Sequence, residues 1–116
     1  MPPSGFSQDA INGLLTFVRA TYENILERYK VKGLSEKEHL QESRGYLEGV
    51  VRSTALLALN GTVSREGIEG LVTFVSTNYR DLIAEINQGK KKEGEAISLE
   101  LDHIGRHLAK FKIEEH

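Results

Sequence analysis

The chain contains no cysteine in its 116 residues. This absence excludes disulfide frameworks, thiolate zinc sites and cysteine nucleophiles, and it is compatible with a reducing compartment. A chain of this length buries roughly two thirds of the surface that its unfolded form exposes, so it can fold without disulfides or a structural metal. We therefore expect one helical-bundle domain covering residues 1–116.

Long apolar runs and an excess of basic charge are also absent. The longest apolar run, Ala55 to Leu59, is far shorter than the roughly 20 residues that cross a bilayer. Lys and Arg number 15 against 17 Asp and Glu, so no broad electropositive surface is available for nucleic acid. The beginning, MPPSGFSQDA, lacks the basic flank and apolar stretch of a secretory signal. We expect a cytoplasmic protein without membrane or nucleic-acid partners, with residues 1–6 as a flexible tail.

Recognisable catalytic signatures are missing too. The chain has neither the nucleophile motif G-x-S-x-G nor the phosphate-binding loop G-x-x-x-x-G-K-[ST]. We expect no cofactor, and a protein without catalytic activity of its own.

Four segments show the apolar spacing of an amphipathic helix. The first runs from Gln8 to about Lys30 after the N-cap Ser7, and Gly33 ends it. The second begins with the capping box S-E-K-E at Ser35 and ends at Asn60-Gly61. The third covers Ser64 to about Gln88, and the fourth begins between Glu93 and Ser98. The predicted buried positions are Ile11, Leu14, Leu15, Val18, Tyr22, Ile25 and Tyr29; Leu40, Leu47, Val50, Val51, Thr54, Leu57 and Ala58; Ile68, Leu71, Val72, Val75, Tyr79, Leu82 and Ile86; and Ile97, Leu101, Ile104, Leu108 and Phe111.

Two stretches of the sequence are nearly the same. INGLLTFV at 11–18 and IEGLVTFV at 68–75 share six of eight letters, and the similarity extends over 7–29 and 64–86. Short links between helices favour antiparallel neighbours. The pattern predicts an all-α, antiparallel four-helix bundle built from two related hairpins, one at about 7–59 and the other at about 64–113.

Each repeated helix keeps one glycine although glycine weakens a helix by up to about 1 kcal/mol relative to alanine. Gly13 and Phe17 lie beside the apolar stripe of the first helix, and Gly70 and Phe74 lie beside that of the third. Such a flank can pack on a neighbouring helix of the same bundle, or it can bind another subunit or protein through the aromatic side chain. Both interpretations stay open.

Helix four carries the clearest chemical pattern. Glu100, His103 and His107 follow one another at i, i+3 and i+7, and Glu36-x-x-His39 repeats the first spacing. The pattern resembles half of the ligand set in di-iron carboxylate bundles, which implies a metal site completed by Glu27 and Glu85 from the other two helices. The alternative is that these residues form a solvated surface.

His107-Leu-Ala-Lys110 also resembles histidine phosphotransfer domains in its pairing of histidine with lysine, although Phe111 stands where those domains have glycine. The main functional hypothesis is a non-catalytic protein-protein interaction or regulatory module, which could self-associate into a homo-oligomer. The alternatives are a metal-binding bundle and a histidine phosphotransfer bundle.

Overall fold

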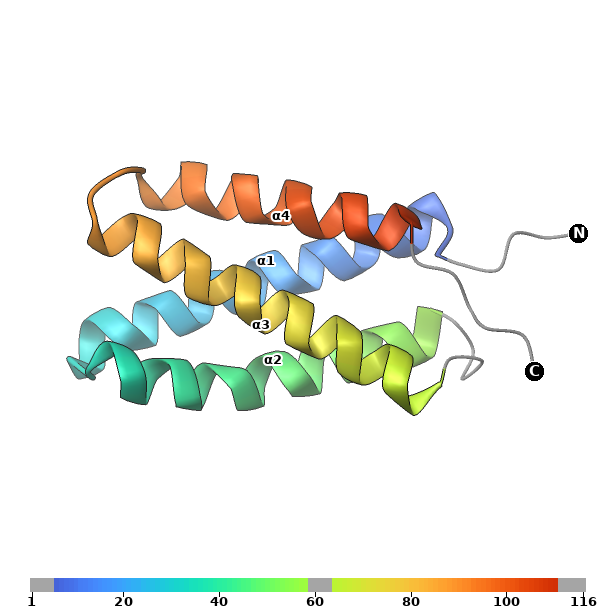
Figure 1. Ribbon diagram of the computed structural model, residues 1–116, viewed down its shortest axis with the longest axis horizontal. Helices are drawn as coiled ribbons and strands as arrows, with labels where there is room; N and C mark the ends of the chain where they lie inside the picture. Colours follow the sequence, from blue (N-terminus) through green and yellow to red (C-terminus); the bar gives the residue numbers. More distant parts are fainter. Residues whose placement is uncertain (1–5, 59–63, 111–116) are drawn as a thin grey trace, which may run out of the picture.

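The computed structural model describes residues 6–58 and 64–110, which fold into four α-helices (Figure 1). They are α1 (Gln8–Lys32), α2 (Glu36–Ala58), α3 (Arg65–Asn87) and α4 (Glu93–Lys110). Successive helices run antiparallel and pack on each other, and α4 closes the bundle against α1. The described ranges contain no strand. The predicted all-α, antiparallel four-helix bundle is confirmed.

Serine side chains begin three of the helices. Ser7 Oγ accepts the backbone N–H of Ala10 at 3.1 Å, and Ser64 Oγ accepts that of Gly67 at 3.0 Å. At α2 the Ser35 hydroxyl accepts the Glu38 amide at 3.2 Å and donates to the Glu38 carboxylate at 2.9 Å. These bonds satisfy N–H groups that have no partner inside the helix. The predicted helix starts are therefore confirmed.

Glycines in the left-handed conformation end α1 and follow α3. Gly33 has φ 61° and donates its N–H to the Tyr29 carbonyl, and Gly89 has φ 69°. Only glycine adopts such angles without a steric cost. Because the stop is at Gly33, α1 continues to Lys32, two residues beyond the predicted end. The predicted end of α2 at Asn60-Gly61 lies outside the described residues.

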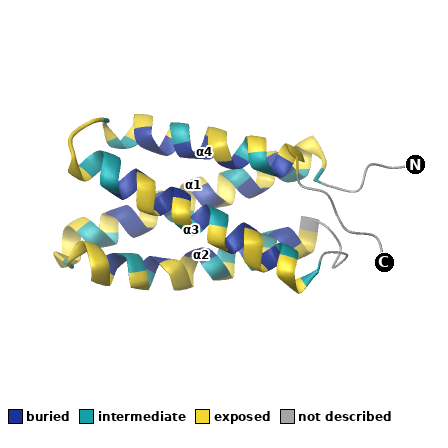
Figure 2. Cartoon of the chain, in the orientation of Figure 1, coloured by how far each residue is buried: buried dark blue, intermediate teal, exposed yellow. Residues whose placement is uncertain are grey.

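Buried and exposed residues alternate along each helix (Figure 2). Many of the buried side chains are spaced four residues apart, the ridge that one helix presents to another. The buried ladders are Leu14, Val18, Tyr22 and Leu26 on α1; His39, Ser43, Leu47, Val51 and Ala55 on α2; Leu71, Val75, Tyr79 and Ile83 on α3; and Ala96, Glu100, Ile104 and Leu108 on α4. Most of the predicted apolar stripe is confirmed as buried.

The clearest error concerns α2. Leu57 was expected in the core, but it is 79% exposed. The buried ladder of α2 passes through Ala55, and two further residues turn the side chain about 200° away from it. The side chain of Ala58 and the predicted seam residue Phe111 lie outside the described residues. Of the expected tail at 1–6, only Phe6 is described, and it packs partly buried against the core.

The described part of the bundle extends over 49 × 23 × 17 Å. None of its helices combines the length and the apolar character that a membrane span requires.

Candidate functional site

A groove of about 270 Å³ runs between α1 and α2. Its lining is uncharged and comes from both helices: Ala10, Gly13, Leu14, Phe17, Thr54 and Leu57. Two large apolar side chains at this groove face solvent, because Phe17 is 57% exposed and Leu57 is 79% exposed. Exposed apolar side chains that lie together mark contact surfaces more often than isolated ones do.

Close packing inside the chain does not explain Gly13, which lines this groove, or Gly49, which is exposed on α2. A Cβ atom added at Gly13 or at Gly49 would meet nothing within 4 Å. Gly105 differs, since its added Cβ would lie 3.3 Å from Leu15 Cδ1. Close packing within the bundle therefore explains Gly105 and leaves Gly13 and Gly49 unexplained. Both positions are exposed, with open space above the backbone.

The corresponding flank of α3 is arranged differently. Phe74 is partly buried and stacks on His107 of α4, with ring centroids 4.0 Å apart and an interplanar angle of 13°. Gly70 is exposed and its added Cβ would also meet nothing within 4 Å. The four residues predicted for one kind of interface thus lie in two environments, and only Gly13 and Phe17 share an open groove.

The groove belongs to a larger surface shared by α1 and α2, here called the α1–α2 face. Charged residues border this face at the end away from the groove. Arg28 Nη2 lies 2.7 Å from Glu42 Oε1, and the guanidinium carbon lies 5.3 Å from the ring centroid of Tyr46. The hydrogen bond from Arg28 lowers the pKa of Glu42, so the carboxylate stays ionised near neutral pH. Tyr46 is 45% exposed and lies three turns before Leu57 on α2. The α1–α2 face therefore consists of an uncharged groove, an aromatic side chain and one ion pair.

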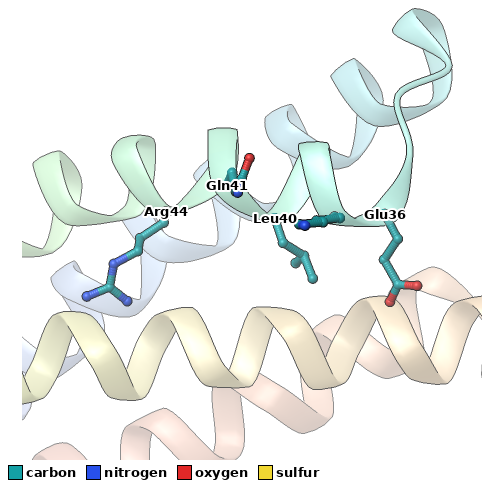
Figure 3. Close-up of a pocket in the computed structure, with 5 residues that line it drawn as sticks. Glu36, Leu40, Gln41 and Arg44 are labelled. Atoms are coloured by element: carbon teal, nitrogen blue, oxygen red, sulfur yellow. The ribbon is translucent and has the colours of Figure 1, made fainter.

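A second groove, of about 470 Å³, lies along α2 on the side of α3 (Figure 3). Figure 3 shows Leu40 pointing from α2 towards α3, and the lining also includes Glu36, Lys37, Gln41 and Arg44. Leu40 is its one apolar residue and is half-buried. This groove is larger than the α1–α2 groove, but its lining comes from α2 alone and includes the charged side chains of Glu36, Lys37 and Arg44.

The predicted metal ligands of α4 occupy three different environments. Glu100 is buried, His103 is exposed with Nδ1 3.5 Å from Glu100 Oε2, and His107 stacks on Phe74. Burial raises the pKa of Glu100, and its Oε2 has no hydrogen-bond partner. In residues 6–58 and 64–110, no group of three His, Asp or Glu side chains is placed to hold a metal ion.

The companion residues of the metal hypothesis are also dispersed. Glu36 and Glu27 are exposed, and Glu85 forms an ion pair with Lys91 at 3.7 Å. His39 is buried, where its Nε2 contacts the Tyr79 hydroxyl at 2.5 Å and its ring stacks on Tyr29 at 4.3 Å. The interpretation of these residues as a solvated surface is therefore wrong for His39 and Glu100, and the exposed Glu27, Glu36 and His103 agree with it.

His107 is the residue on which the phosphotransfer hypothesis depends. It is half-buried against Phe74, and burial lowers its pKa. Lys110 is exposed at the last position of α4. No contact between the two side chains supports a phosphorylated histidine at this position.

The repeated tyrosines meet at the centre of the bundle. Tyr22 and Tyr79 are fully buried, with ring centroids 5.1 Å apart. The Tyr22 hydroxyl donates to the Val75 carbonyl at 2.8 Å, and that of Tyr79 contacts His39. Both hydroxyls thus have the partner that burial requires. The two tyrosines, predicted as buried positions, therefore lie inside the core, hydroxyl groups included.

Sequence reasoning missed Leu57 and Thr54 as parts of the groove, because it assigned both to the buried face of their helix. The sequence contained one signal for an exposed leucine. Leu56 and Leu57 are adjacent, and adjacent side chains of a helix point about 100° apart, so the two cannot face the same side. No protein-family description matches this chain, and no curated protein or solved structure is significantly similar to it.

Proposed function

We propose that this protein is a non-catalytic interaction module that binds a protein partner through the α1–α2 face. The observation that carries the proposal is the uncharged groove, at which Phe17 and Leu57 expose most of their side chains. A few anchor side chains that become buried on binding, often aromatic ones, supply most of the binding energy in protein interfaces. Gly13 adds support, because nothing inside the chain occupies the space above it.

The α1–α2 face suits a helical or flat apolar partner surface. Its groove has no charged lining, and the ion pair between Arg28 and Glu42 at its border is already formed within the chain. A partner would therefore bury apolar area without leaving an unpaired charge, which is the costly event in interface formation.

The internal duplication belongs to the same proposal. It is supported by the equivalent bonds with which Ser7 and Ser64 cap their helices, and by the contact of Tyr22 with Tyr79 across the core. The buried ladders of α2 and α4 support it as well, because each of the four α4 positions is 57 residues after a buried α2 position. The two hairpins would then share an ancestor, and the α1–α2 hairpin alone would keep its phenylalanine exposed.

The experiment compares two neighbouring leucines. Leu57→Glu places a charge at the groove, whereas Leu56→Glu places the same charge on the adjacent residue, which is 40% exposed and does not line the groove. Tagged wild type, Leu57→Glu, Leu56→Glu and Phe17→Glu are used to capture partners from a lysate. Circular dichroism checks that the helicity of each variant is unchanged. We expect Leu57→Glu and Phe17→Glu to lose capture while Leu56→Glu keeps it. Equal capture by all variants would refute the proposal.

A further inference from the structure

We propose that the α1–α2 face binds a second copy of this chain, so that α1 of each copy lies on α2 of the other. The inference rests on the proposed function, because it uses the same groove and names its partner. The two copies are related by a two-fold axis that lies in the interface and runs parallel to the helices.

The register of the two helices determines which residues meet. Arg28 of α1 is bonded to Glu42 of α2, so these two residues lie at one level. Gly13 lies as many residues before Arg28 as Leu57 lies after Glu42. Gly13 and Leu57 both line the groove. Because the helices are antiparallel, Gly13 and Leu57 also share a level. By the same count, Phe17 lies level with Ser53.

A two-fold axis parallel to the helices keeps these levels and exchanges α1 for α2. Leu57 of each copy then lies over Gly13 of the other, where an added Cβ would meet nothing within 4 Å. Phe17 of each copy lies over the small, exposed Ser53 of the other. Each large exposed side chain thus meets a small one, as an isologous interface requires.

The charges at the border of the face match in the same arrangement. Arg28 carries the positive charge on α1, and Glu42 carries the negative charge on α2 at the same level. Exchange of α1 for α2 therefore places Arg28 of one copy over Glu42 of the second copy, and the reverse. An in-plane axis perpendicular to the helices would fail in this respect. If such an axis crossed the helices at the centre of the uncharged stretch, each Arg28 would lie opposite the charge-free end of the other copy's α1–α2 face.

The first test is the mass of the protein in solution by sedimentation equilibrium, over a concentration range from micromolar to millimolar. We expect wild type to form a dimer, and Leu57→Glu to raise the dimer dissociation constant by at least roughly tenfold. Leu56→Glu is the matched control and should dimerise like wild type. A wild-type monomer throughout the range, or a dimer that Leu57→Glu leaves intact, would overturn the proposal.

The second test uses charge reversal. Arg28→Glu and Glu42→Arg each place two like charges at one level, so each variant alone should dimerise more weakly than wild type. In a mixture, the reversed charges of one variant face the opposite charges of the other, so mixed dimers should form in preference to either homodimer. Native mass spectrometry of one tagged and one untagged variant counts the species. A mixture without preference for the mixed dimer would contradict the arrangement.

The outcomes separate this inference from the proposed function. If wild type stays monomeric but Leu57→Glu alone loses capture of another protein, self-association is refuted and the interaction module stands. If the dimer forms and no other protein is captured, the second copy is the partner. If both measurements are unaffected by Leu57→Glu, both proposals are refuted.

Discussion

Replacement of Glu100 by methionine should stabilise the protein at neutral pH. Glu100 is 2% exposed on α4, and its Oε2 makes no hydrogen bond among the described residues, although His103 Nδ1 lies 3.5 Å away. A buried polar group left without a partner costs roughly 1 to 3 kcal/mol, and an ionised one tends to the upper end. Methionine has a similar length and no such requirement. We expect Glu100→Met to raise the free energy of unfolding at pH 7.5 by about 1 to 2 kcal/mol.

The effect should depend on pH in a defined direction. Burial raises the pKa of Glu100 above its usual 4.5, so the folded protein holds this proton more tightly than the unfolded chain does. The stability contributed by the protonated carboxyl is complete below pH 4.5 and is lost as the pH rises through the folded pKa. The advantage of Glu100→Met should therefore grow between pH 4.5 and pH 8.

Urea unfolding followed by circular dichroism measures this difference at each pH. Glu95→Met is the matched control, because Glu95 is exposed on the same helix and its replacement should change stability by less than about 0.5 kcal/mol. A Glu100→Met protein that is less stable than wild type at pH 7.5, or an advantage that does not change with pH, would refute the reasoning.

Three further predictions concern other residues. His39→Phe should remove the partner of the Tyr79 hydroxyl and destabilise the protein by roughly 1 to 3 kcal/mol at pH 7.5 in urea unfolding. Burial lowers the pKa of His39 below 6.5, so the stability that neutral His39 provides is lost as the pH falls below 6.5. The difference in unfolding free energy between wild type and His39→Phe should therefore shrink below pH 6.5. Gly13→Ala should stabilise the monomer by up to about 1 kcal/mol, because the added Cβ meets nothing within 4 Å. The same variant should weaken the dimer. An unchanged dimer dissociation constant would speak against close approach of the second copy at this position. Elemental analysis of protein purified without chelator should find no stoichiometric metal, whereas a metal content that His103→Ala abolishes would restore the metal hypothesis.

Local signals in the sequence determined much of the fold correctly. Ser7, Ser35 and Ser64 act through atoms three residues away, so the capping bonds and the helix starts could be predicted from the sequence alone. Gly33 likewise ends α1 because of its own backbone conformation. Such features depend on neighbours along the chain and not on the packing of other helices.

The buried face of α2 was predicted only in part: Leu47 and Val51 were expected in the core and are buried there, but the beginning of the ladder was missed. Its ladder begins with His39 and Ser43, two polar residues that apolar spacing does not identify. They are buried because α1 and α3 supply contacts, as Tyr29 and Tyr79 do for His39. Because apolar spacing added Leu57 to the predicted core, the groove beside this exposed side chain was missed.

The candidate site was predicted in part. Gly13 and Phe17 were identified as a second face from their position beside the apolar stripe, and they do line an open groove. Phe74 has the same local sequence, but His107 stacks on it from α4. The difference arises from the neighbouring helix, which the repeated stretch itself does not encode.

The most direct test of the central claim is hydrogen–deuterium exchange at low and high protein concentration. If the α1–α2 face is the contact surface, amides in 10–17 and 53–57 should become better protected as the concentration rises, while those of α3 and α4 should not change. Concentration-dependent protection confined to α3 and α4, or none at all, would contradict the account.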